Sequence, residues 1–167
     1  KMTYQELKQE EQQYVMNTYG RFSIALDHGE GSKLWDVEGK RYIDLTSGIG
    51  VCSVGYNNQT LIDAITVQAH KLMHVSNLFT TAPMVQTAKT LVKATGMGKV
   101  FFSNSGAESN EGAIKLARKY SFDKYGKGRS KIITLWNSFH GRTVTTLNAT
   151  GQDKFHNYFF PFTEGFD

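Results

Sequence analysis

The sequence contains a single cysteine, Cys52, among its 167 residues. One cysteine excludes a disulfide within the chain and is typical of proteins from a reducing compartment. No apolar run approaches the length of a membrane-spanning helix, and the first residues are polar, unlike the apolar core of a signal peptide. We therefore expect a cytoplasmic protein that has no membrane partner.

Charge of one sign is only slightly in excess, with 19 Lys and Arg against 15 Asp and Glu and a net charge of +4. Basic residues gather between Lys115 and Lys131, a pattern that also occurs in nucleic-acid-binding patches. The few aromatic residues nearby do not alternate with the basic ones, as stacking platforms for bases would. A solvated helix face followed by a basic loop is the simpler interpretation, so we expect no nucleic-acid partner.

Two familiar nucleotide-binding loops are also missing. No Walker-type phosphate loop occurs, and Gly48 and Gly50 are followed by Gly55 rather than by a glycine three positions later. Nucleotide hydrolysis and nicotinamide chemistry are therefore disfavoured. His70 and His74 have the spacing of a helical metal pair, but the residues between them include no glutamate and no third ligand is evident. We expect no metal site.

The length allows one sizeable hydrophobic core, and the 40% hydrophobic and 20% charged content is ordinary for a globular protein. Residues 1–50 are expected to form an N-terminal segment of helix and small strands. Residues 3–18 have a helical pattern, in which Thr3 and Glu6 are spaced as a capping box. Short apolar stretches broken by glycines then predict three antiparallel strands: Ser23–Leu26, Lys33–Asp36 and Arg41–Asp44.

Residues 51–167 are expected to be the first, incomplete part of a larger domain. The glycine-rich stretch Ser47–Gly55 at its border predicts an ordered loop. Apolar residues at helical spacing then predict a helix capped by Thr60. A second helix is predicted to open at Pro83 and to end near Gly96, because proline suits a first turn.

Beyond these helices the pattern changes to strand, helix and strand. Lys99–Ser103 and Lys131–Leu135 are short apolar runs typical of buried strands, and Ala107–Phe122 between them has helical spacing. A strand, helix and strand in this order form a βαβ unit, which implies a parallel sheet with a right-handed crossover. The predicted fold class is therefore α/β.

A phosphate site is expected where the first of these strands turns into the helix. Ser105, Gly106 and Ala107 are small residues that allow backbone N–H groups to approach an anion, and the helix dipole favours negative charge at this end. Many strand-to-helix turns carry serine and glycine only as caps, so capping alone is an equally good interpretation of this pattern.

A second candidate segment, Ser138–Thr143, follows the other predicted strand. Ligands bind open α/β sheets at the carboxyl ends of their strands. Phe139 is suited to stack on a planar ring, and Arg142 to bind a carboxylate through two parallel hydrogen bonds. The alternatives are a core aromatic residue for Phe139 and a surface ion pair for Arg142.

Four segments in order resemble the class III pyridoxal-phosphate-dependent aminotransferases. Phe101–Tyr120 is similar to that family's phosphate loop and following helix, and Ser138–Thr143 to its ring-stacking segment. Leu34–Asp44 resembles the family's N-terminal strand region, and His74–Phe79 resembles the acetylornithine aminotransferase branch. The resemblance covers nearly the whole chain.

The resemblance implies a role for each candidate residue. Gly106 and Ala107 would bind the phosphate of pyridoxal 5'-phosphate (PLP) through backbone N–H groups, and Ser105 would assist. Phe139 would stack on the pyridine ring, and Arg142 would bind the substrate α-carboxylate. The implied reaction moves the δ-amino group of N-acetylornithine to 2-oxoglutarate in arginine synthesis. A homodimer is also implied, with residues 76–81 near the partner chain.

The chain departs from the family pattern in three places. Residues 55–59 replace a common Gly-His-x-His-Pro turn, and Gly112 stands where alanine is usual. The family's catalytic Schiff-base lysine lies further downstream, so we expect residues 1–167 alone to be inactive. The alternatives are another class III transaminase (ornithine, succinylornithine, succinyldiaminopimelate or 4-aminobutyrate) and a non-catalytic phosphate-binding or dimerising fragment.

Overall fold

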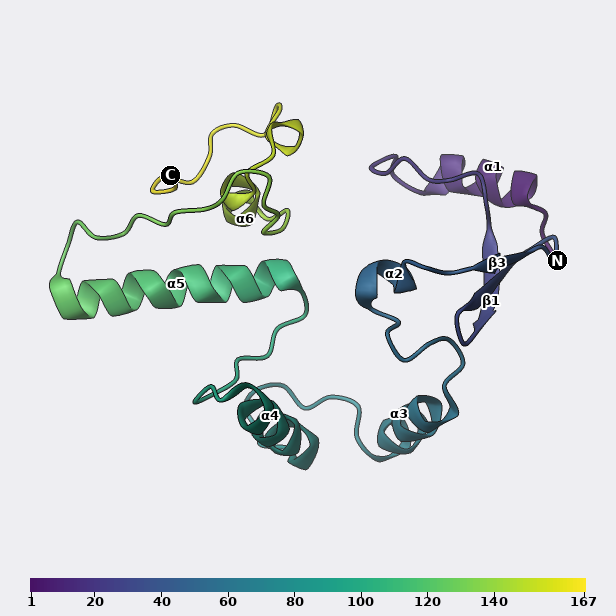
Figure 1. Cartoon of the computed structure of the whole chain (residues 1–167), viewed down its shortest axis with the longest axis horizontal. Coiled ribbons are helices and arrows are strands. Elements are labelled where there is room, and N and C mark those ends of the chain that lie inside the picture. Colours follow the sequence, from purple (N-terminus) through teal and green to yellow (C-terminus); the bar gives the residue numbers. More distant parts are fainter. The chain divides into compact units, whose positions relative to one another are not determined.

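The computed structural model describes all residues, 1–167, in two compact units, residues 1–79 and 80–167 (Figure 1). Unit 1 contains three helices and the only β-sheet of the chain, and unit 2 is helical with irregular connections. The mixture of helix and strand confirms the α/β class. The expected domain boundary after residue 50 stays a prediction.

Helix α1 (Tyr4–Tyr14) opens unit 1 with the predicted capping box. The Thr3 N–H donates to Glu6 Oε2 at 2.8 Å, and the Glu6 N–H donates back to Thr3 Oγ1 at 3.3 Å. The predicted extension to residue 18 is wrong, because Val15 is extended and ends the helix. No residue of α1 is buried, so no packing offsets the lower helix propensity of β-branched Val15.

Three short strands form an antiparallel sheet in the order β1 (Leu26–Glu30), β2 (Lys33–Asp36) and β3 (Arg41–Ile43). The second strand matches the prediction, and the third ends one residue earlier than predicted, at Ile43. The first lies later than predicted, because the tight turn at Gly31 pairs Glu30 with Lys33 and so sets the register of the hairpin. The apolar pattern alone carries no information on that register.

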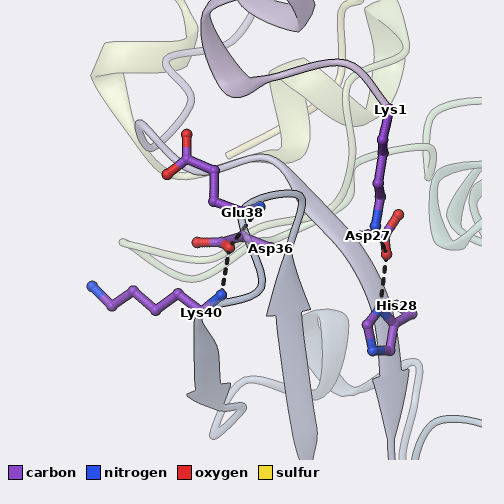
Figure 2. Close-up of polar contacts among 6 residues, drawn as sticks. All are labelled: Lys1, Asp27, His28, Asp36, Glu38 and Lys40. Atoms are coloured by element: carbon purple, nitrogen blue, oxygen red, sulfur yellow. Dashed lines mark hydrogen bonds and ion pairs between the residues drawn. The ribbon is translucent and has the colours of Figure 1, made fainter.

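A buried carboxylate shapes the turn between β2 and β3. Asp36 accepts hydrogen bonds from the Glu38 N–H at 3.1 Å and the Lys40 N–H at 2.8 Å (Figure 2). The Tyr42 hydroxyl donates to the other carboxylate oxygen of Asp36 at 2.7 Å. This hydrogen bond is the main reason that the pKa of Asp36 is lowered. On β1, Asp27 contacts both Lys1 and His28 (Figure 2).

A second carboxylate, Asp44, organises the chain after β3. It accepts from the Thr46 N–H at 2.8 Å, the Ser47 N–H at 3.0 Å and the Tyr56 hydroxyl at 2.7 Å. The hydrogen bond from Tyr56 is the largest cause, followed by those from the Thr46 hydroxyl and N–H, and together they lower the pKa of Asp44 to about 2. The same contact raises the pKa of Tyr56 to about 12. The Asp44–Tyr56 pair therefore links two segments of unit 1.

Replacing Tyr56 by phenylalanine should raise the pKa of Asp44 toward its usual value of 3.8. Because the folded pKa of Asp44 is depressed, its stabilisation is full above pH 3.8 and is lost as pH falls toward about 2. Because the folded pKa of Tyr56 is raised, its stabilisation is full below pH 10.0 and is lost as pH rises toward about 12. Carboxyl NMR titration measures the change, and an Asp44 midpoint unaltered in Tyr56→Phe would contradict it.

The glycine-rich stretch after Asp44 contains one irregular turn, α2 (Ser47–Gly50), in which Gly48 and Ile49 have left-handed backbone angles. Helix α3 (Gln59–Lys71) follows. Its cap is Asn58, whose side chain accepts from the Leu61 N–H at 3.1 Å, and the prediction of Thr60 as the cap is wrong. Asparagine caps helices better than threonine, so the earlier start is favoured.

Unit 2 begins with α4 (Ala82–Thr95), which confirms the predicted helix. Pro83 lies in its first turn, and Gly96 ends it in the left-handed conformation. Helix α5 (Gly106–Tyr125) starts one residue earlier than predicted and ends three residues later, at the cap Gly126. A short helix, α6 (Val144–Ala149), lies beside α5 (Figure 1), and a 3-10 turn, η1 (Asp153–Phe155), follows it.

The predicted strands Lys99–Ser103 and Lys131–Leu135 do not form a ladder, which corrects the expectation of a parallel sheet within this chain. Parallel pairing is limited to two isolated bridges, Ile132 with Phe166 and Trp136 with Gly151. A strand exists only where a neighbour takes up its backbone hydrogen bonds. Residues 99–103 have no such neighbour in the chain.

The expectation of one sizeable core is also wrong. The only buried apolar residues are Leu147 and Ala149 of α6, next to the fully buried Thr146 and Thr150. Apolar residues of the predicted strands remain uncovered, including Ile133, which is 81% exposed. The packed part of unit 2 is therefore the region around α6. No helix combines the length and apolarity that crossing a membrane requires.

Candidate functional site

The first turn of α5 presents two backbone N–H groups that have no partner in the chain. Ser105 caps the helix, and its Oγ accepts from the Glu108 N–H at 3.2 Å. The Glu108 carboxylate turns back and accepts from the Asn104 N–H at 2.5 Å. Capping therefore satisfies the N–H groups of Asn104 and Glu108 and leaves those of Gly106 and Ala107 available. Both interpretations of this turn, capping and anion binding, are compatible with the geometry.

The second candidate segment, residues 138–143, packs directly against this turn. Gly141 is buried and has a φ of +127°, and a Cβ built on it would lie 2.6 Å from the Cβ of Ala107. It would also lie 2.7 Å from Thr146 Oγ1. Only glycine permits this approach. Gly141 therefore brings together the turn at Ser105–Ala107 and the 138–143 segment, which the sequence predicted as two separate candidates. Gly141 itself was not among the predicted site residues.

Two hydrogen bonds on either side of Gly141 hold the segments together. Asn110 Nδ2 donates to the His140 carbonyl at 2.7 Å, and the Thr143 hydroxyl donates to Glu111 Oε1 at 2.5 Å. Asn110 and Glu111 were not among the predicted site residues. Their spacing from Ala107, three and four positions, places them on the same face of α5, which was the available signal.

The buried hydroxyl of Thr150, the residue that ends α6, supports the 138–143 segment. It accepts from the His140 N–H at 3.0 Å and lies 2.9 Å from the Thr146 carbonyl, to which it donates. Ser138 is tied to the same region, because its carbonyl accepts from Gln152 Nε2 at 3.0 Å. No local pattern marks Thr150 as important, because its partner is ten residues away.

Phe139 and Arg142 lie close together on this segment. The Arg142 guanidinium carbon is 5.9 Å from the ring centroid of Phe139 and 5.6 Å from that of Phe155. The two rings meet edge to face at 5.9 Å. Phe139 is 55% exposed, so it is not a core aromatic residue. An aromatic face and a cation suited to a carboxylate are therefore held beside an anion-attracting helix end.

The availability of the helix-end amides can be tested by removing one of them. Gly106→Pro deletes the N–H at the first helical position, where proline is tolerated, and the preceding Ser105 is already extended as proline requires. Gly106→Ala keeps the N–H, and a Cβ there meets nothing within 4 Å. Because a hydrogen bond to a charged group contributes about 1.5–3 kcal/mol, we expect the proline variant to bind inorganic phosphate about tenfold or more weakly in calorimetric titration. Equal affinity in the two variants would exclude this amide from anion binding.

Known proteins resemble the chain over nearly its whole length. Residues 14–167 match the family model of the class III aminotransferases. Acetylornithine aminotransferase of Haemophilus ducreyi is 56% identical over 99% of this chain and 42% of its own length. That of Wolinella succinogenes is 53% identical over 93% of this chain and 40% of its own length. The chain thus spans about two fifths of these relatives.

A solved structure matches the arrangement as well. Ornithine aminotransferase from Toxoplasma gondii, crystallised with oxidised glutathione and with PLP at partial occupancy in its active site, aligns with a TM-score of 0.93 and 28% identity. The alignment covers 99% of this chain and 39% of that one. The turn at Gly106–Ala107 and the segment around Phe139 therefore lie within a chain that belongs to the class III family of PLP-dependent aminotransferases.

Proposed function

We propose that the complete protein transfers the δ-amino group of N-acetylornithine to 2-oxoglutarate, as a cytoplasmic step of arginine synthesis. The observation that carries the proposal is the packing of the Phe139–Arg142 segment against the first turn of α5 through Gly141. The choice of N-acetylornithine rests on the relatives, which are acetylornithine aminotransferases. Amino acids and 2-oxo acids are the substrates of the family in general.

The residues present fit PLP. The two available N–H groups of Gly106 and Ala107 suit its phosphate, with Ser105 holding the turn in shape. The half-exposed ring of Phe139 suits its pyridine face. When bound, PLP supplies the electron sink for carbanion chemistry at the amino-acid α- or ω-carbon, and the protein supplies binding and orientation.

Arg142 is proposed to bind the substrate α-carboxylate. Its guanidinium lies beside the contacting rings of Phe139 and Phe155, so both rings limit its orientation. A planar, always charged fork held in this way presents paired donors to a carboxylate. An amine that lacks a carboxylate would leave the guanidinium without this partner, so the site is expected to favour amino acids.

We propose that the catalytic Schiff-base lysine lies outside residues 1–167. Lys115 belongs to the middle of α5, well beyond its first turn, and Lys131 pairs with Asp167 at 2.6 Å. Neither is placed to serve the turn at Gly106. Residues 1–167 alone are therefore proposed to be inactive. The complete protein is proposed to be a homodimer with residues 76–81 near the partner chain.

The test is a transaminase assay of the complete protein with PLP, N-acetylornithine and 2-oxoglutarate, followed as glutamate formation. Turnover far above that of free PLP is expected, and residues 1–167 alone should not exceed free PLP. Ornithine, succinylornithine, succinyldiaminopimelate and 4-aminobutyrate serve as competing donors. A higher kcat/KM with any of them would replace N-acetylornithine in the proposal, and no turnover with any donor would refute the transaminase function.

A further inference from the structure

The second turn of α5 carries two polar side chains, Asn110 and Glu111, that the proposed reaction does not use directly. Both are half-buried, and both contact the segment that carries Phe139 and Arg142. The Asn110 amide holds the His140 carbonyl at 2.7 Å, and the Glu111 carboxylate accepts the Thr143 hydroxyl at 2.5 Å. The segment is thus tied to α5 on both sides of Gly141.

The contact with Glu111 sets the direction of a chain of hydrogen bonds. Thr143 has one hydroxyl proton, and it is donated to the carboxylate. The Thr143 oxygen then accepts from the Thr146 N–H at 3.1 Å and from the Thr146 hydroxyl at 2.7 Å. Thr146 Oγ1 in turn accepts from the Thr143 N–H at 3.0 Å. A half-buried carboxylate therefore orients the hydroxyl that caps α6.

Resting on the proposed function, we infer that Glu111 is a positioning residue for the carboxylate-binding Arg142. Arg142 directly precedes Thr143, so a shift of Thr143 moves the guanidinium with it. The N–H groups of Gly106 and Ala107 belong to α5 itself and do not depend on this bond. Loss of the Glu111 contact therefore weakens binding of the amino donor's carboxylate while leaving anion binding at the helix end unchanged.

The test compares Glu111→Ala and Glu111→Gln in the complete protein. Glutamine keeps an oxygen that accepts the Thr143 proton, whereas alanine removes the acceptor. We expect Glu111→Ala to raise KM for the amino donor about tenfold, the usual effect of one lost hydrogen bond to a charged group. Glu111→Gln should stay within about twofold of the wild type by the same reasoning. Asp123→Ala, on the same helix but contacting only Lys119, controls for lost negative charge.

Two further measurements separate positioning from a general structural role. The affinity for inorganic phosphate should be unchanged in Glu111→Ala, because the N–H groups of Gly106 and Ala107 do not depend on the Thr143 contact. Amide hydrogen exchange of residues 139–143 should be faster in Glu111→Ala and at the wild-type rate in Glu111→Gln. Phosphate affinity and KM that weaken together, or exchange and KM that do not change, would overturn the inference. A wild-type protein without transaminase activity would refute the proposed function, and hydrogen exchange would still decide whether Glu111 holds the segment.

Discussion

Arg142→Ala in the complete protein is expected to lower kcat/KM for the amino donor by the equivalent of about 2–5 kcal/mol, the usual effect of removing one partner of a desolvated, hydrogen-bonded charge pair. The guanidinium is the cation that the structure holds beside Phe139, at 5.9 Å from its ring centroid. Arg142 is exposed in residues 1–167, so this magnitude applies where the rest of the complete protein and the bound substrate exclude water from the ion pair. The effect should appear with every amino donor that has an α-carboxylate.

Two variants make the Arg142 experiment specific. Arg142→Lys keeps the charge but loses the planar fork, so its kcat/KM should lie between those of the wild type and Arg142→Ala. Arg129→Ala removes a guanidinium that also lies over an aromatic ring, 4.2 Å from the centroid of Tyr125, but beyond the opposite end of α5. It should leave kcat/KM unchanged. A loss in Arg129→Ala equal to that in Arg142→Ala would point to general charge rather than to a carboxylate clamp.

Gly141→Ala is expected to destabilise the contact between α5 and the 138–143 segment by about 2 kcal/mol or more. A φ of +127° is strained for any L side chain, and the new Cβ would lie 2.6 Å from the Cβ of Ala107 and 2.9 Å from its Cα. Backbone atoms cannot move aside as a flexible side chain does. The segment should therefore be displaced from the helix end, and Phe139 and Arg142 with it.

Chemical unfolding and the transaminase assay of the complete protein measure the two consequences of Gly141→Ala. The unfolding midpoint should fall, and kcat/KM should fall in the protein that remains folded. Gly98→Ala is the matched control, because Gly98 has no positive φ and a Cβ there meets nothing within 4 Å. If Gly141→Ala had the stability and activity of Gly98→Ala, the close contact with Ala107 would not be needed.

Features whose partners lie within a few residues of each other could be predicted from the sequence. The capping box of Thr3 and Glu6, the place of Pro83 in the first turn of α4 and the end of α4 at Gly96 all follow from hydrogen bonds and backbone angles inside one helical turn. The anion-attracting turn at Ser105 is local in the same sense. The family resemblance depended on such segments, and the match over residues 14–167 confirms it.

Features that depend on distant partners were decided only by the tertiary structure. The hydrogen bonds of Asn110 with His140 and of Glu111 with Thr143 join residues 30 and 32 positions apart, and the close packing of Gly141 on Ala107 brings them together. For the same reason, apolar runs 99–103 and 131–135 were predicted as strands but form no ladder, because a strand requires a neighbour that its own residues do not specify. The sequence by itself determined the capping box of α1, the end of α4 at Gly96 and the kinds of side chain in the candidate site. Their assembly around Gly141 is a tertiary property, since it depends on which backbone atoms approach across the fold.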